Sequence, residues 1–274
     1  MTILNSTSVD EEFETPKFTN RLKSMLKLDF YRLFHTPAFY IMLIIASMIP
    51  ALIMTTSGME SPTMTTSHSM QAAPSGQNVE FTNAWQLVES TSGSAVVDDP
   101  LDFAGFANIN MLFIFAGLLI SIFVAHDYSS GFVKNIFTVH PKKIDYVISK
   151  STVGVYGGVM MILVYVFGTV LSGLLIGKSF DVSVSGLVLC LISKALLMCV
   201  FCPLFLSIAV FLRNKLWLTI CFTFLFGMML YPAASVATLN STIIIVIISL
   251  VTGATGAVVF GTISSLFLRK RDLA

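Results

Sequence analysis

The chain has 274 residues, of which 55% are hydrophobic and 11% are charged, and its formal net charge is +1. Soluble domains carry about 25% charged residues, so this composition excludes a water-soluble globular domain. The near-neutral charge also argues against a nucleic-acid partner. The apolar residues fall in blocks of about twenty, which is the length that a helix needs to cross about 30 Å of hydrocarbon.

The residues before the first apolar block divide into a tail and a predicted helix. Residues 1–15 are polar and acidic, which predicts a disordered tail without the basic start of a cleavable signal peptide. Thr15-Pro16 has the pattern of a helix start. Residues 16–36 place apolar side chains approximately on one face, at Phe18, Leu22, Met25, Leu26 and Leu33. They predict an amphipathic helix in the membrane interface, whereas the alternative is that their basic residues only flank the first span.

Six apolar blocks predict an all-α membrane domain over residues 37–268. The predicted spans cover residues 37–55, 103–125, 146–176, 184–212, 216–234 and 242–268. The third block is long for one crossing, so part of it should tilt or lie outside the hydrocarbon. Small residues at four-residue steps predict close helix packing at Gly154 and Gly158, and at Gly253, Ala257 and Gly261.

Lysine and arginine residues are distributed very unevenly over this arrangement. One side holds fourteen of the sixteen, namely Lys17, Arg21, Lys23, Lys27, Arg32, Lys134, Lys142, Lys143, Lys150, Arg213, Lys215, Arg269, Lys270 and Arg271. Cytoplasmic segments are enriched in these residues, which predicts a multi-pass protein of the cell membrane with both ends, including the basic tail 269–274, in the cytoplasm. The extracellular loop 56–103 carries neither residue type, and within it residues 80–92 have the spacing of a short amphipathic helix.

The predicted spans also lack the residues that several kinds of chemistry require. No Asp or Glu falls within them, and the chain has no recognisable catalytic or zinc-binding motif. Ion-driven transporters usually bind their ion at intramembrane carboxylates, so we do not expect ion coupling. We expect no enzyme either, and assign no catalytic residue and no metal ligand.

Two polar features leave alternatives open. Lys194 is the charged side chain that lies deep in a span: either its ammonium reaches the outer headgroups or a partner such as Asp181, or it forms a polar wall of a substrate path. A loose cluster of methionines and one histidine lies on the predicted outer side. Thioethers can bind Cu(I), so this cluster could hold copper, although its spacing is irregular and the segment is low in complexity. These residues are Met54, Met59, Met64, His68 and Met70.

Residues 125–150 contain the most informative pattern of the chain. Its distinctive residues are Asp127, Gly131, Lys134, Asn135, Pro141, Lys142 and Lys150. They resemble the cytoplasmic loop of bacterial ABC-transporter permeases of the type-two exporter family, although Lys142-Lys143 stands where that family often has Ser-Arg. In that family an acidic residue ends the second span, a glycine turn and a short helix follow, and proline and basic residues lead to a lysine that opens the third span. The long loop 56–103 is similar to that of permeases that expel lantibiotics and bacitracin-like peptides.

The resemblance implies that this chain pairs with an identical or related permease subunit and with two separate ATPase subunits, which would bind ATP and Mg²⁺. This chain itself is then expected to hold no cofactor. Within the coupling loop 126–146, a coupling helix at residues 128–140 would dock into the ATPase, and the interfacial helix would lie on the same side. The residues implied in coupling are Asp127, Gly131, Lys134, Asn135, Pro141, Lys142 and Lys143; the alternative for the lysines is a role in topology alone.

The resemblance also implies a substrate path between the two permease subunits, near the first, second and fifth spans. Polar candidates for this path are Asn108, Asn110, Lys194 and Tyr231. We therefore expect export of an antimicrobial peptide or another amphipathic compound. One alternative is a copper- or lipid-linked exporter of the same family, and another is a membrane scaffold or sensor subunit that transports nothing.

Overall fold

The computed structural model describes residues 18–58, 83–87, 109–139, 142–212 and 215–270. Within these ranges the chain is helical, and six helices are long and apolar enough to cross a membrane. They are α2 (Pro37–Gly58), α4 (Met111–Ser129), α6 (Lys143–Ile176), α7 (Val184–Leu212), α8 (Leu216–Ala234) and α9 (Ile243–Lys270). These helices confirm the predicted all-α membrane class with six spans.

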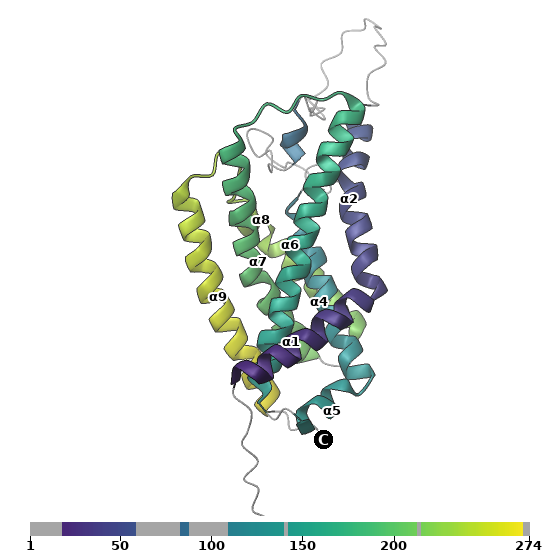
Figure 1. Ribbon diagram of the computed structural model, residues 1–274, viewed down its shortest axis with the longest axis vertical. Coiled ribbons are helices and arrows are strands. Elements are labelled where there is room, and N and C mark those ends of the chain that lie inside the picture. The colour runs from purple at the N-terminus through teal and green to yellow at the C-terminus, as the bar shows by residue number, and fades with distance from the viewer. Residues whose placement is uncertain (1–17, 59–82, 88–108, 140–141, 213–214, 271–274) are drawn as a thin grey trace, which may run out of the picture.

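Three shorter helices lie at the two ends of the bundle (Figure 1). Helix α1 (Phe18–His35) crosses the lower end obliquely, and α5 (Phe132–Val139) lies beside it. We call this the α1 end; the last turns of α9 reach it as well. The 3₁₀ helix η1 (Ala84–Leu87) lies at the opposite end, which we call the η1 end.

Helix α4 is the most deeply buried of the spans and packs against α6, α7 and α8. Helix α2 packs mainly on α6, and α9 packs mainly on α7. Small residues bring these pairs together, because a Cβ at Gly168 of α6 would lie 2.5 Å from the backbone oxygen of Ser47 in α2. Gly154 and Gly158 likewise face side chains of α4 and α7, and Gly253 faces α7, as predicted. Around Gly261 no atom of the described residues lies within 4 Å of such a Cβ, so this glycine makes no close contact with them.

Helices α4 and α6 continue past their predicted ends at the α1 end. Helix α4 runs to Ser129, four residues beyond the predicted boundary, and α6 begins at Lys143. At about 1.5 Å per residue, the 34 residues of α6 extend about 51 Å, well beyond the hydrocarbon thickness. Its first turns therefore project out of the apolar layer and contact α1.

Helix α1 packs a stripe of four residues against the bundle: Arg21, Met25, Asp29 and Leu33. The four-residue spacing puts them on one face of the helix. Met25 and Leu33 were among the predicted apolar positions, whereas Arg21 and Asp29 were not. Predicted apolar positions Phe18 and Leu22 are exposed and half-buried, respectively. Two charges thus face the interior of the bundle.

Candidate functional site

The connection from α4 to α5 is a tight turn around one glycine. Gly131 has φ of +70°, a left-handed conformation that glycine adopts without steric cost. Its carbonyl oxygen accepts hydrogen bonds from the backbone N–H groups of Lys134 (3.1 Å) and Asn135 (3.3 Å), which starts α5. The chain direction therefore changes within two residues of the end of α4.

Helix α5 has one apolar face and one polar face. Val133 and Ile136 are buried against the bundle, and the ring of Phe137 packs edge-on against Tyr146 of α6, with centroids 5.6 Å apart. Lys134 and Asn135 are exposed on the opposite face. The helix is thus held by its apolar side and presents amide and ammonium groups outward.

A buried ionic cluster joins α1, α4 and α6 directly behind α5. The ammonium of Lys150 lies 2.8 Å from Oδ1 of Asp29 and 2.6 Å from Oδ2 of Asp127. Nη2 of Arg32 lies 2.6 Å from Oδ1 of Asp127. Tyr146 donates a hydrogen bond to Asp127 Oδ2 at 3.0 Å, and Ser149 donates one to Asp29 Oδ2 at 2.6 Å. Asp29, Asp127 and Lys150 are at most 1% exposed.

A further ion pair extends the cluster along the same two helices. Nε of Arg21 donates a hydrogen bond to Oδ2 of Asp145 at 3.1 Å, and both side chains are buried. With this pair, three carboxylates face three cations at the α1 end. Such a balanced set avoids uncompensated buried charge, and removal of one member of a buried pair typically costs about 3–5 kcal/mol.

Aromatic rings form the apolar wall of the cluster. The Lys150 ammonium lies 3.9 Å from the ring centroid of Phe123 in α4. The Arg32 guanidinium carbon lies 4.0 Å from the centroid of Phe132, the first residue of α5, and 5.4 Å from that of Phe123. Cations at these distances are attracted to the ring faces.

The cluster includes two acidic residues in the parts of α4 and α6 that extend beyond the predicted spans. Asp127 and Asp145 lie inside the helices α4 and α6 and are buried there. Hydropathy placed both in the loop because each is charged. Their arginine partners come from α1, more than ninety residues earlier in the chain, and Lys150 of α6 also pairs with Asp127. Arg32, Tyr146 and Ser149 were missed as well; the only available signal was the four-residue spacing of Arg21, Met25, Asp29 and Leu33.

The residues predicted for coupling fall into three groups. Asp127 is buried in the ionic cluster and is directed into the protein. Lys134, Asn135 and Lys142 are exposed, the first two in α5 and the third just before α6. Lys143 is half-buried and donates a hydrogen bond to the carbonyl oxygen of Leu268 in α9 at 2.7 Å. Pro141 lies outside the described residues.

The residues predicted for a substrate path lie nearer the η1 end. Lys194 of α7 is fully buried, and its ammonium donates hydrogen bonds to Asn110 Oδ1 at 2.6 Å and to the Ala234 carbonyl oxygen at 3.4 Å. The alternative in which Lys194 reaches the headgroups is therefore wrong. Lys194 instead joins α7 to the start of α4 and the end of α8. Tyr231 is half-buried in α8, and Asn108 lies outside the described residues.

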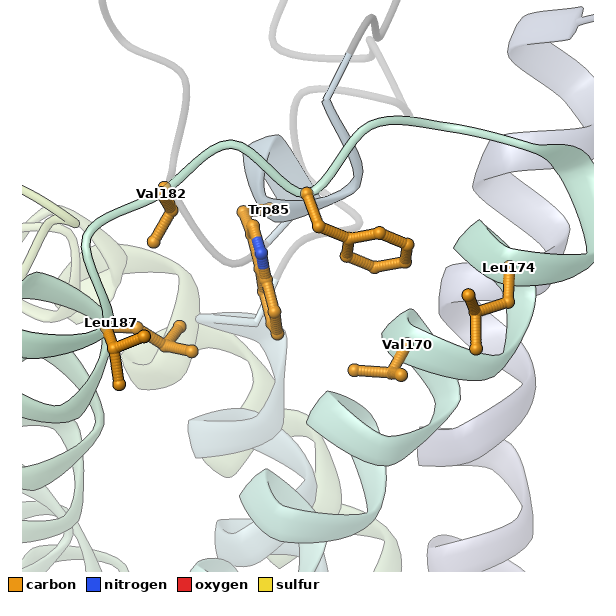
Figure 2. A pocket seen from close by; sticks show the side chains of 7 residues that line it. Trp85, Val170, Leu174, Val182 and Leu187 are labelled. Carbon is orange, nitrogen blue, oxygen red and sulfur yellow. The ribbon is translucent and has the colours of Figure 1, made fainter.

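An apolar pocket of about 320 Å³ opens at the η1 end. Its wall combines η1, the end of α6, the following connection and the start of α7; Trp85, Val170, Leu174, Phe180, Val182, Val184 and Leu187 line it. Figure 2 shows Trp85 between Val182 and Leu187 on one side and Val170 and Leu174 on the other. Backbone contacts fix η1 here, because Ala84 N–H donates to the Ser179 carbonyl oxygen at 2.9 Å. Of the helix predicted for residues 80–92, the structure describes this short segment.

Of the residues considered for copper binding, Met59, Met64, His68 and Met70 lie outside the described residues, and Met54 lies within them. Met54 is 1% exposed and packs with Ile53 and Ala84. Its thioether thus belongs to an apolar contact between α2 and η1. Among the described residues, no group of three or more His, Cys, Asp or Glu side chains could hold a metal ion.

Comparison with known proteins gives a match over most of the chain. The family described as ABC-2 family transporter protein matches residues 25–230, from the middle of α1 to the end of α8. No curated protein and no solved structure matches the chain. Subunits of this family are membrane permeases without an ATPase domain, and they work with an ABC ATPase partner. The chain is a permease of the ABC-2 transporter family.

Proposed function

We propose that this chain is the membrane subunit of an ATP-driven exporter of the cell membrane, with α5 as its coupling helix. The observation that supports this proposal best is the arrangement of α5: its apolar face is anchored to the bundle, while Lys134 and Asn135 face outward. The α1 end also carries most of the lysines and arginines, which favours a cytoplasmic location for α5 and for both chain ends.

Partner-driven motion also fits the chemistry of the buried carboxylates. Asp29, Asp127 and Asp145 each face an arginine or lysine within 3.1 Å. A carboxylate whose charge is already compensated by a cation at this distance is a poor site for a transported sodium ion. Energy would therefore come from ATP and Mg²⁺ bound by the partner subunits.

We further propose that two permease subunits form the path and export an antimicrobial peptide or another amphipathic compound. Supporting this, α8 exposes an aromatic and thioether surface that includes Phe222, Phe224, Phe226, Met228 and Met229. Flexible Met side chains adapt to varied apolar ligands. Helix α2 exposes a comparable apolar face, with Ile44 and Met48 about 60% accessible.

The apolar pocket favours a second candidate, the export of a lipid or a lipid-linked compound. Its volume lies at the lower end of the range of ligand sites, about 300–1,000 Å³. Trp85 is half-buried at this end of the bundle, where an indole ring suits the boundary between headgroups and acyl chains. A lipid substrate predicts that a photoreactive acyl chain labels the pocket, and that Leu187→Trp, which fills it, reduces labelling and transport together.

Purification from native membranes tests the main proposal. An affinity-tagged chain should retain an ABC ATPase, and the retained complex should hydrolyse ATP. Lys134→Glu combined with Lys142→Glu, or Gly131→Pro, should release the ATPase without preventing membrane insertion. Lys23→Glu with Lys27→Glu is the matched control, because it reverses two exposed charges of α1. Equal retention of the ATPase in all variants would contradict docking through α5.

A further inference from the structure

Arg32 links three helices at the α1 end. It belongs to α1, its Nη2 pairs with Asp127 of α4 at 2.6 Å, and its guanidinium carbon lies 4.0 Å from the ring centroid of Phe132 in α5. Lys150 binds the same carboxylate, but its ammonium lies farther from Phe132, at 5.7 Å. Among the charged side chains of the cluster, Arg32 is therefore the one in close contact with α5.

The position of Phe132 allows its contact with Arg32 to fix the direction of α5. Phe132 follows Gly131 directly, and Gly131 is the left-handed pivot between α4 and α5. A stack on Phe132 fixes the first residue after the pivot and hence the direction in which α5 leaves α4. A planar guanidinium can stack on a ring and pair with a carboxylate simultaneously, whereas an ammonium acts as a point charge.

The hydrogen bonding of Arg32 indicates a role other than maximal stability. Its Nη1 is buried without a hydrogen-bond partner among the described residues, and leaving such a donor unpaired is unfavourable. Its side chain is only 18% exposed, although the sequence pattern allowed a simple flanking charge. A flanking charge would remain in water, and a lysine would serve equally well.

We propose that Arg32 is a positioning residue that locks the coupling helix to α1 and α4. This inference rests on the proposed function and deepens it. Through Arg32, a displacement of α5 by the ATPase moves α1 and the end of α4 together, instead of being lost as rotation about Gly131. Phe132 is the other half of the contact.

Three substitutions separate this role from charge alone. Arg32→Lys keeps the charge and loses the planar stack, Phe132→Leu keeps an apolar side chain and loses the ring, and Phe132→Trp keeps the ring face. Lys27→Arg is a control on the exposed side of the same helix. Three quantities are measured in each reconstituted complex: the retained ATPase, its basal ATP hydrolysis, and the hydrolysis stimulated by an added cationic amphipathic peptide.

We expect Arg32→Lys and Phe132→Leu to retain the ATPase but to lower stimulated hydrolysis about 2- to 30-fold, the range that the loss of one cation–π contact gives. Stimulated hydrolysis in the double variant should be no lower than in the more impaired of the two single variants. In Phe132→Trp and Lys27→Arg it should stay within about 2-fold of the original chain. Full stimulation in both single variants, or losses that multiply in the double variant, would overturn the proposal.

A distance measurement on the permease alone distinguishes failure of this inference from failure of the proposed function. Spin labels at Lys27→Cys and Asn135→Cys, both exposed, report the position of α5 relative to α1, after the exposed Cys221 is replaced by serine. Arg32→Lys and Phe132→Leu should broaden the distance distribution, and Phe132→Trp should not. Unchanged distributions overturn the positioning role, whereas a wild-type permease that never retains an ATPase overturns the proposed function.

Discussion

Lys150→Met should destabilise the bundle more than any other single change of a lysine at the α1 end. Methionine approximates the length of lysine and removes only the charge. In the protein the ammonium lies 2.6 Å from one buried carboxylate and 2.8 Å from another. At an effective dielectric constant of about 20, each contact contributes about 6 kcal/mol of attraction before desolvation is counted.

The net loss is smaller because both carboxylates keep other partners. Asp127 still faces Arg32 and accepts a hydrogen bond from Tyr146, and Asp29 still accepts one from Ser149. We therefore expect a loss of about 3–5 kcal/mol, which is typical when one partner of a buried pair is removed. Adding Asp29→Asn removes the carboxylate charge that has lost its cation and should restore about 2 kcal/mol.

The assay is the apparent free energy of unfolding in mixed detergent micelles, with Lys134→Met as the control. Lys134 is exposed on α5, so the same chemical change there should have little effect. If Lys150→Met unfolds at the same denaturant concentration as Lys134→Met, or if Asp29→Asn makes it worse, the ionic cluster does not stabilise the bundle as argued.

Three further changes have definite expected outcomes. Gly131→Ala should lower the apparent free energy of unfolding by about 1–2 kcal/mol, because alanine is strained at φ of +70° although no atom would crowd its Cβ; an unchanged thermal melt would contradict this. Gly168→Ala should separate α2 from α6 and lower the melting temperature, whereas Gly261→Ala, with open space around its Cβ, should not; equal melts would refute the packing argument. Lys194→Met should cost about 1–3 kcal/mol, since it removes a donor from Asn110 and Ala234, and a gain in stability by the same melt would count against it.

Hydropathy and charge were sufficient to predict the number of spans and six of their twelve boundaries to the residue, including both ends of α7 and of α8. Apolar blocks of membrane-spanning length leave few alternatives, because every backbone polar group in hydrocarbon must be paired within a helix. The amphipathic pattern also predicted a helix at α1, and the family resemblance of residues 125–150 implied a short helix at residues 128–140, where the structure has α5. These signals are local, so a single segment of sequence contains them.

The ionic cluster could not be predicted from the same signals. Asp127, Asp145 and Lys150 each indicate a loop or a span end when taken alone, because an unpaired charge is expensive to bury. Their burial depends on Arg21, Asp29 and Arg32, which only the packing of α1 on α6 brings within reach. The placement of Lys194 was also missed because Asn110 and Ala234 lie on two other helices. Both errors concern contacts between distant segments.

Photo-crosslinking from position 135 in native membranes tests the central claim most directly. A photoreactive residue at Asn135, on the exposed face of α5, should form an adduct with an ABC ATPase. The same residue at Leu175, 79% exposed near the opposite end of the bundle, should not. An ATPase adduct at position 175 alone, or labelling of position 135 by an impermeant reagent added outside intact cells, would contradict the account.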